Sequence, residues 1–194
     1  MTRIAIIGAG PAGLTLARIL QNHGVEFTVF EKQHAAVEEW PATTLDIHVE
    51  TGQRAIKESG LWDEFVKLAR YDSEDFILVD KNNKTHLDLR GIDTGRPEID
   101  RSQLRKIFLD ALGPEAIQWG KTVVQVKNGT IYFTDGAESG FDLVVGADGA
   151  WSKVRTALTY IPPFYSGVSG LQLWISDINA RYPELGEMEA CGLA

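Results

Sequence analysis

Hydrophobic and polar positions along the chain alternate between short apolar runs and segments with helical spacing, a pattern that predicts an α/β fold. Residues 4–7 and 143–145 are apolar runs typical of strands buried on both faces, and residues 25–30 predict another strand. Residues 11–21, between the first two strands, have the composition and spacing of a helix. A second helix begins at Arg101.

Each of these helices has an apolar face that predicts its packing. Apolar residues recur at helical spacing in both, so one face should lie against the strands. In the first helix we expect burial of Ala12, Leu16, Ile19 and Leu20. In the second we expect burial of Leu104, Ile107, Phe108, Ala111 and Leu112.

The middle of the chain adds helices and hairpins to this pattern. Residues 51–59 and 61–68 predict two helices, the second with Leu61, Phe65 and Leu68 on one packed face. Residues 76–79 and 85–89 flank a polar turn and predict a hairpin.

Two further strand patterns follow near the end of the chain. Asn128-Gly129 is a strong two-residue hairpin signal before residues 131–133. Further on, the alternation of Leu171, Leu173 and Ile175 predicts strands within residues 164–179.

Composition and charge exclude several classes of protein. Of the 194 residues, 44% are hydrophobic and 24% are charged, which excludes disorder, collagen and coiled coil. The net charge of −8 opposes nucleic acid and anionic lipid, so we expect no nucleic-acid partner and no membrane partner. Cys191 is the only cysteine and the histidines lack metal-ligand spacing, so we expect no metal and a cytoplasmic location.

The first strand leads directly into Gly8-Ala9-Gly10-Pro11-Ala12-Gly13, which has the spacing G-x-G-x-x-G. In a dinucleotide-binding turn, the first glycine permits a tight bend and the second lets a pyrophosphate approach the backbone. The third allows the helix to lie close to the strand, and the helix directs its N-terminal amides at the phosphates. The motif, the strand before it and the helix after it together predict dinucleotide binding.

Glu31 closes the second strand, where such a fold places the carboxylate that accepts hydrogen bonds from the ribose hydroxyls. A second anion there disfavours a dinucleotide with a 2′-phosphate. These features leave NAD and FAD both open.

Four stretches in order resemble one family of flavoproteins. They are GAGPAGL at residues 8–14, TLDIH at 44–48, EIDRSQLR at 98–105 and DLVVGADGAWSKVR at 142–155. The chain resembles the FAD-dependent aromatic-hydroxylase type of monooxygenase, within the branch of the tetracycline-inactivating monooxygenases and their fungal relatives. The resemblance extends over nearly the whole chain and covers the N-terminal half of such an enzyme.

The resemblance implies a set of cofactor-binding residues and no defined catalytic residue. The set is Gly8, Ala9, Gly10, Pro11, Ala12, Gly13, Glu31, Lys32, Asp46, Arg101, Leu104, Val123, Asp148 and Gly149. Arg101 also fits a solvated charge at a helix start, although a cation there opposes the helix dipole. Asp46 fits equally an ordinary polar residue of an alternating strand. Asp148-Gly149 also fits a plain strand-to-helix turn.

The resemblance also implies an organisation and an activity. We expect an α/β, Rossmann-like FAD/NAD(P)-binding domain formed by residues 1–75 and 98–160. An incomplete β-sheet substrate domain, residues 76–97 and 161–194, interrupts it. FAD, with NADPH or NADH as reducing co-substrate and O2 as oxidant, would hydroxylate an aromatic or polyketide-like small molecule.

Two departures from the family keep other functions open. Ala42 and Thr43 replace a usual glycine pair, and no glycine is followed by the aspartate of a later family motif. A flavin-binding remnant without full activity is one alternative, and a flavin halogenase, epoxidase or reductase is another. A nicotinamide dehydrogenase fits the Arg101 and Asp148 segments poorly. We expect a dimer or a complementing C-terminal half as the protein partner, since a cut sheet exposes unpaired strand edges.

Overall fold

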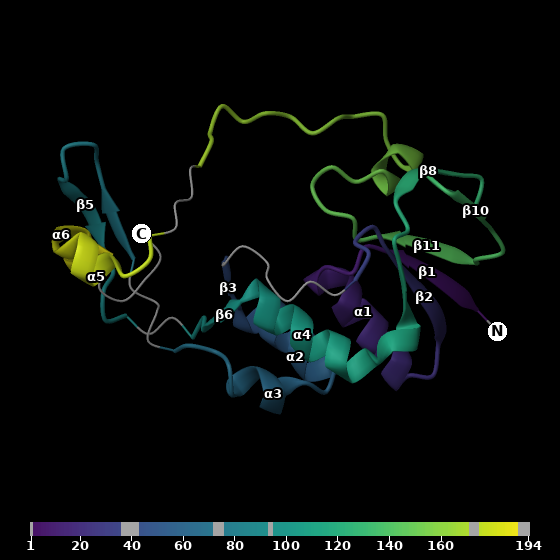
Figure 1. Cartoon of the computed structure of the whole chain (residues 1–194), viewed down its shortest axis with the longest axis horizontal. Helices are drawn as coiled ribbons and strands as arrows, with labels where there is room; N and C mark the ends of the chain where they lie inside the picture. The colour runs from purple at the N-terminus through teal and green to yellow at the C-terminus, as the bar shows by residue number, and fades with distance from the viewer. Residues whose placement is uncertain (1, 36–42, 72–75, 93–94, 171–174, 190–194) are drawn as a thin grey trace.

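A parallel sheet of four strands, in the order β11–β1–β2–β7, forms the centre of the protein (Figure 1). The computed structural model describes residues 2–35, 43–71, 76–92, 95–170 and 175–189. The strands are β1 (Arg3–Ile7), β2 (Glu26–Glu31), β7 (Ile117–Trp119) and β11 (Leu143–Gly146). All three pairings between them are parallel. The expected α/β class and the strands expected at residues 4–7, 25–30 and 143–145 are therefore confirmed.

Both faces of this sheet are covered, because side chains of β1 alternate between two hydrophobic clusters. Ile4 and Ile6 contribute to the cluster on the helical side. Ala5 and Ile7 contribute to the cluster on the other side. Since successive side chains of a strand point to opposite faces, a continuous apolar run such as this one requires a layer on each face.

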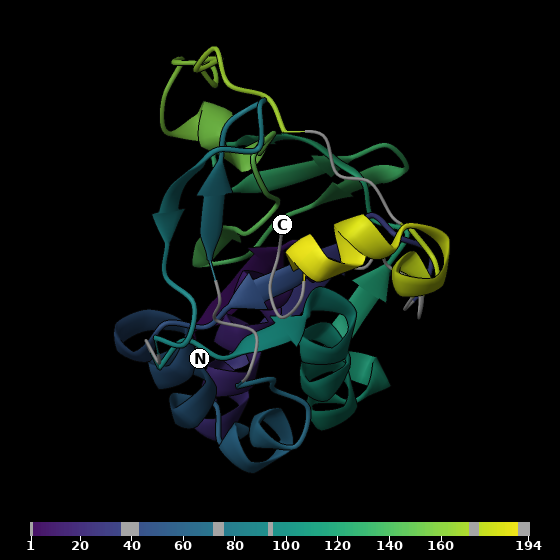
Figure 2. The ribbon, with the colours of Figure 1, turned by 90° about the vertical axis from the view of Figure 1, so that its left-hand side faces the viewer.

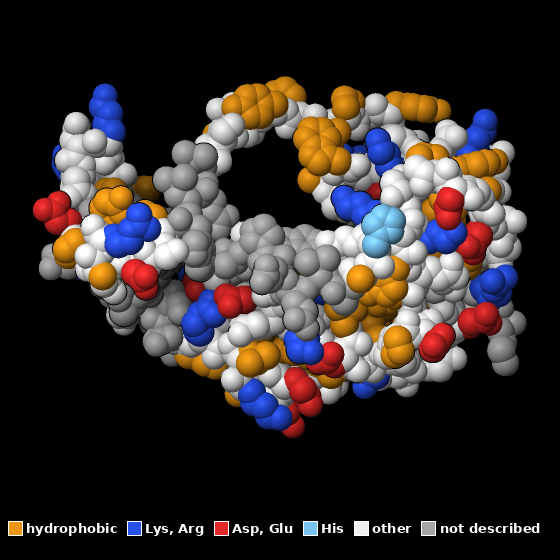
Figure 3. Space-filling model, in the orientation of Figure 1, with side chains coloured by type: hydrophobic (Ala, Val, Ile, Leu, Met, Phe, Trp, Pro, Cys, Tyr) orange, Lys and Arg blue, Asp and Glu red, His pale blue; other side chains and the backbone are white. Residues whose placement is uncertain are grey.

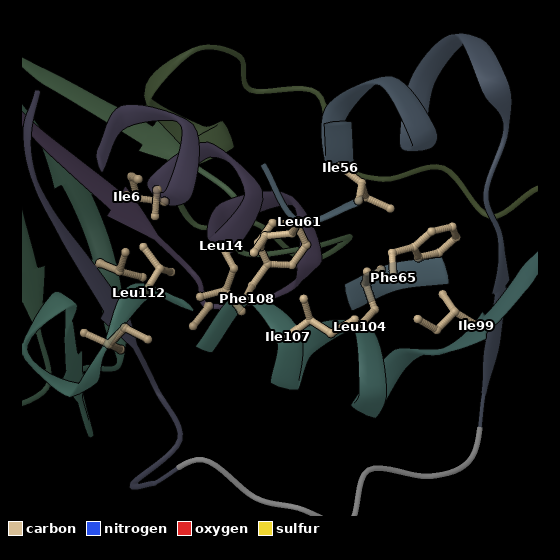
Figure 4. Close-up of a cluster of buried hydrophobic side chains, with 14 of the residues drawn as sticks. Ile6, Leu14, Ile56, Leu61, Phe65, Ile99, Leu104, Ile107, Phe108 and Leu112 are labelled. Atoms are coloured by element: carbon tan, nitrogen blue, oxygen red, sulfur yellow. The ribbon is translucent and has the colours of Figure 1, made fainter. Parts of the chain in front are cut away.

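The helical layer consists of α1 (Pro11–Asn22) and α4 (Arg101–Leu112), which pack against each other. Figure 4 shows Leu14 of α1 close to Phe108 of α4, with Leu112 farther along α4. Four of the five residues expected to pack from the second helix are buried, and Ala111 is partly buried.

The buried face of α1 differs from the expected one. Gly13, Leu14 and Ala17 are buried, whereas Ala12 is exposed. Leu16 and Leu20 pack only at the edge of the core. The reason lies at Gly13, where a Cβ atom would overlap the carbonyl oxygen of Gly8. This close approach turns the Gly13 side of the helix inward.

An antiparallel sheet of three strands covers the other face. It consists of β8 (Val123–Lys127), β9 (Thr130–Phe133) and β10 (Gly136–Glu138). The ring of Phe133 lies 5.0 Å from that of Phe30 in β2, centroid to centroid. The predicted turn joins β8 to β9, with positive φ angles of 50° at Asn128 and 73° at Gly129.

Shorter elements lie around this core. Two helices, α2 (Arg54–Glu58) and α3 (Trp62–Val66), follow a π-helical turn, η1 (Val49–Gln53). Leu61 and Phe65 are buried as expected, but Leu68 is exposed because α3 ends before it. Short 3-10 turns are η2 (Pro114–Ala116) and η3 (Val154–Ala157).

Two two-stranded sheets complete the strands. The first pairs β3 (Thr44–Asp46) with β6 (Glu98–Asp100), and the second is the expected hairpin of β4 (Ile77–Val79) and β5 (Thr85–Asp88). Figure 1 shows this hairpin at the far end from the parallel sheet, and Figure 2 separates it from the C-terminal helices.

The strands predicted within residues 164–179 are absent from the described part of that range. Residues 159–170 form an extended segment without regular structure, and α5 (Ile178–Arg181) and α6 (Pro183–Glu189) follow it. Figures 1 and 3 show residues 158–170 arching away from the body. An alternating apolar pattern forms a strand only when a neighbouring strand pairs with it, and the arch has none. Leu171 and Leu173 lie outside the described residues, as does Ala42.

Candidate functional site

The site begins where β1 turns into α1. Gly8 has a φ of +108°, and its amide donates to the carbonyl of Phe30 at 2.8 Å. A Cβ atom at Gly8 would overlap the carbonyl oxygen of Ala147, in the loop after β11. The glycine-rich turn therefore lies directly against the loop that leads to Asp148 and Gly149.

Gly10 contrasts with its neighbours in the motif because its outer side is open. A Cβ atom at Gly10 would meet no other atom within 4 Å, whereas Cβ atoms at Gly8 and Gly13 would overlap backbone. Gly10 is the N-cap of α1 and no side chain caps that end of the helix. Pro11 follows as the first helical residue. We call this open end of α1, with the turn from Gly8 to Gly10, the cradle.

The carboxylate of Glu31 lies against the cradle at the end of β2. It is buried, and Oε2 accepts from the amide of Ala9 at 2.7 Å. Its other oxygen accepts from the amide of Gln33 at 3.0 Å. The position predicted for a ribose-binding carboxylate is therefore occupied by a group that also shapes the turn. Lys32 is exposed beside it.

Arg105 is a residue of this region that sequence reasoning did not single out. Only 4% of it is exposed, and its Nε donates to the carbonyl of Ala9 at 2.9 Å. Its guanidinium carbon lies 5.6 Å from the centre of the Trp119 ring. Burial lowers the pKa of Arg105 from its usual value, and the negative charge of Glu31 opposes that shift. The sequence did contain an indication that Arg105 is buried, because Arg105 falls between Leu104 and Phe108 on the apolar face of α4.

Asp148 holds the loop after β11 in shape. Ser152 Oγ donates to Asp148 Oδ1 at 2.6 Å, and the amide of Lys153 donates to Oδ2 at 2.7 Å. Gly149 has a φ of +82°, which only glycine adopts readily. The side chain of Asp148 is thus engaged within its own loop.

Asp46 and Arg101 lie at the antiparallel pair β3–β6. Asp46 is in register with Glu98, and the amide of Arg101 donates to the carbonyl of Thr43 at 2.9 Å. The side chains of Asp46 and Arg101 are both exposed. Asp46 therefore belongs to a different sheet from β1 and β2, which lead to Gly8 and Glu31, and Arg101 is the first residue of α4.

Leu104 and Val123 belong to the two hydrophobic clusters. Leu104 is buried on the helical side of the parallel sheet, and Val123 on the side of β8. Figure 4 shows Leu104 near Ile99 and Phe65. Their side chains serve packing, as expected for Val123.

Glu98 is a buried carboxyl beside this pair of strands. Burial, and secondly the charge of Asp46, raise the pKa of Glu98 above its ordinary 4.5, and Arg70 opposes this at 3.6 Å. Arg70 also pairs with Asp100 at 2.9 Å. The folded protein thus holds the Glu98 proton more tightly than the unfolded chain does.

A Glu98→Gln variant should show how much the Glu98 carboxyl lowers the free energy of unfolding as the pH rises. A raised folded-state pKa makes the folded state bind more protons, so the wild type should lose stability as pH rises above 4.5 through that pKa. The variant lacks this loss, so its unfolding free energy should improve relative to wild type between about pH 4 and about pH 7. Denaturant titrations at several pH values measure this. A difference that stays constant with pH would contradict it.

The described residues contain neither a group of metal-binding side chains nor a helix that could span a membrane. Among them, no group of three or more His, Cys, Asp or Glu side chains could hold a metal ion. None of the helices in the described ranges has the length and apolar content that crossing a membrane requires.

A comparison with models of known families shows to which family the chain belongs. The model of the FAD-binding domain family matches residues 1–172. The chain belongs to this family. The open side of Gly10 lies at the uncapped start of α1, beside the first helical amides.

Similar proteins with known descriptions are monooxygenases and related flavoproteins. Monooxygenase asqM of Emericella nidulans is 36% identical over an alignment 212 residues long. The alignment covers 98% of this chain and 48% of the relative. The structure of tetracycline destructase Tet(51) is 25% identical with a TM-score of 0.59, over 80% of this chain and 40% of that one. These matches confirm the expected branch.

A further solved structure contains the cofactor. HpxO of Klebsiella pneumoniae, solved as a variant complexed with FAD, is 27% identical with a TM-score of 0.59. The match covers 81% of this chain and 42% of that one. The chain thus spans about half the length of the relatives it matches, or somewhat less.

Proposed function

We propose that the cradle binds FAD, with the pyrophosphate at Gly10 and the adenosine ribose at Glu31. The observation that carries this proposal is the open side of Gly10 at the uncapped start of α1. Helix amides and the positive end of the helix dipole stabilise phosphate there. Glu31 retains acceptor capacity on both oxygens, since a carboxylate offers about four lone-pair sites and two hydrogen bonds to it are described.

The remaining predicted residues fit around this arrangement. Ala9, Ala12 and Gly13 supply the turn and the first helical amides, and Lys32 lies beside the ribose. The loop of Asp148 and Gly149 adjoins Gly8 and would face the flavin side. Arg101, Asp46, Leu104 and Val123 belong to this proposal by resemblance. So does the division into residues 1–75 and 98–160 for the cofactor and 76–97 and 161–194 for the substrate.

The proposed activity of the whole protein is that of an FAD-dependent monooxygenase. With NADPH or NADH and O2, bound FAD supplies the redox chemistry that hydroxylates an aromatic or polyketide-like small molecule. The part of this chain is to bind and orient the cofactor. We assign no catalytic residue, and we expect the protein to act in the cytoplasm.

An uncovered apolar surface supports a need for further polypeptide. Tyr160 is 99% exposed and Phe164 is 92% exposed. Further exposed apolar side chains along the same arch are Leu158, Ile161, Tyr165 and Val168. The β4–β5 hairpin likewise exposes Leu78 and Leu87, and an isolated two-stranded hairpin is only marginally stable in water.

We assign this surface to the polypeptide that follows the matched region in the relatives. The matched structures are more than twice as long as the matched region, so a C-terminal half of comparable size exists in them. Large exposed apolar patches mark interaction sites. A second copy of this chain is the competing occupant and would appear as a dimer of the chain alone.

Complementation tests the proposed function. The chain is co-expressed with the C-terminal half of monooxygenase asqM, and the complex is assayed for bound flavin and for NADPH-dependent O2 consumption. We expect both, with hydroxylated product when an accepted aromatic compound is present. Bound flavin with no O2 consumption would contradict the monooxygenase proposal and favour the flavin-binding remnant. A halogenated, epoxidised or reduced product would favour the other flavin reactions.

A further inference from the structure

We propose that Arg105 is a positioning residue of the cradle, which directs the Gly10 amide toward the phosphates by holding the carbonyl of Ala9. This inference rests on the proposed function, because it assumes a phosphate ligand at Gly10. It adds to that function a residue which neither the motif nor the ribose carboxylate supplies.

The first step of the argument is that Ala9 is held from both sides. Glu31 Oε2 accepts from its amide at 2.7 Å, and Arg105 Nε donates to its carbonyl at 2.9 Å. Both contacts are buried. Glu31 comes from β2 and Arg105 from α4, so two distant parts of the chain fix one residue of the turn.

The second step is the geometry of the peptide that joins Ala9 to Gly10. The described chain has no cis peptide bond. In a planar trans peptide the N–H points opposite to the C=O. Because Arg105 fixes the direction of the Ala9 carbonyl, it also fixes the direction of the Gly10 amide, which points away from Arg105. The open side of Gly10 is where we place the pyrophosphate.

The third step concerns why an arginine is buried here. A buried cation is costly unless charges and hydrogen bonds compensate it. The negative charge of Glu31 and the face of the Trp119 ring both favour the guanidinium. Arginine keeps its charge under these conditions and its planar group holds a fixed orientation. Packing alone would be served by an uncharged side chain of similar length.

The test compares the affinities for ADP and adenosine, since only ADP carries the phosphates. Arg105→Met keeps the stem and removes the guanidinium, and Arg105→Lys keeps a charge and one donor. Arg18→Met is the matched control, because Arg18 Nη1 donates to the carbonyl of Ala111 and so also links α1 to α4. Dissociation constants are measured on the full chain by ligand-observed NMR.

We expect Arg105→Met to weaken the affinity for ADP by about tenfold or more, since a hydrogen bond to a charged group contributes a free energy of that size. The affinity for adenosine should stay within about twofold of wild type. Arg105→Lys should restore part of the ADP affinity, and Arg18→Met should change neither ligand. Equal losses for both ligands, or no loss, would overturn the positioning role. If Arg105→Met fails to fold, Arg105→Lys serves instead, and its loss of affinity for ADP is compared in the same way with its loss of affinity for adenosine. If wild type binds neither ligand, the proposed function itself fails.

Discussion

A Gly10→Asp variant is expected to fold at least as stably as wild type and to lose FAD binding. Gly10 has φ −80° and ψ 175°, which any residue adopts, and a Cβ atom there meets nothing within 4 Å. Aspartate is a better N-cap than glycine by a few tenths of a kcal/mol. Its carboxylate would occupy the amides and repel the pyrophosphate, so we expect FAD to bind about a hundredfold more weakly or worse.

The measurement pairs thermal unfolding without ligand with FAD titration of the same samples. Gly10→Asn is the matched control, because it has the same shape and can cap the helix without a charge. We expect Asn to weaken FAD less than Asp does. An Asp variant that binds FAD as tightly as wild type would show that the phosphates lie elsewhere.

The second large effect is expected from Gly13→Ala. Alanine favours a helix over glycine by about 1 kcal/mol. The new Cβ atom would overlap the backbone oxygen of Gly8, and backbone cannot move aside as a flexible side chain can. Overpacking costs about 1–3 kcal/mol and more where backbone must shift. We therefore expect a net loss of about 2 kcal/mol in unfolding free energy, together with weaker FAD binding.

Gly10→Ala is the control for this variant, because it adds the same methyl group to the same motif without an overlap. Its unfolding free energy should fall by about 1 kcal/mol or less, because alanine is a poorer N-cap than glycine, and so by less than that of Gly13→Ala. Denaturant titration measures the unfolding free energies of Gly13→Ala and Gly10→Ala and so distinguishes the two variants. If Gly13→Ala is as stable as wild type, the close packing of α1 against the turn is wrong.

Much of the cradle could be predicted from sequence because its signals are local. A four-residue apolar run, a glycine spacing and an acidic residue at a strand end each act through neighbouring backbone. The continuous run of residues 4–7 correctly implied a layer on both faces of the strand. Asn128-Gly129 correctly implied a hairpin, because both residues adopt positive φ without strain.

What sequence missed depended on contacts between distant residues. The inward face of α1 is set by the approach of Gly13 to Gly8, which overrides the larger apolar residues Ile19 and Leu20. Arg105 was passed over because arginine is normally solvated. Its role becomes visible only when α4 is placed beside the turn.

The strands expected within residues 164–179 show a different limit. Alternation in sequence describes a strand that has a partner, and the described arch has no strand beside it. Leu171 and Leu173, two of the residues that gave the pattern, lie outside the described residues, and Ile175 precedes α5 without forming a strand. The same pattern would fit a sheet if the C-terminal polypeptide supplied the neighbouring strand.

The most direct measurement is an FAD titration of the purified chain, followed by flavin absorbance between about 350 and 500 nm, with Gly10→Asp alongside. The account predicts saturable binding by wild type, displacement by ADP, and loss of binding in the folded variant. A folded wild-type chain that binds no FAD, or a variant that binds it equally well, would contradict the assignment of the cradle.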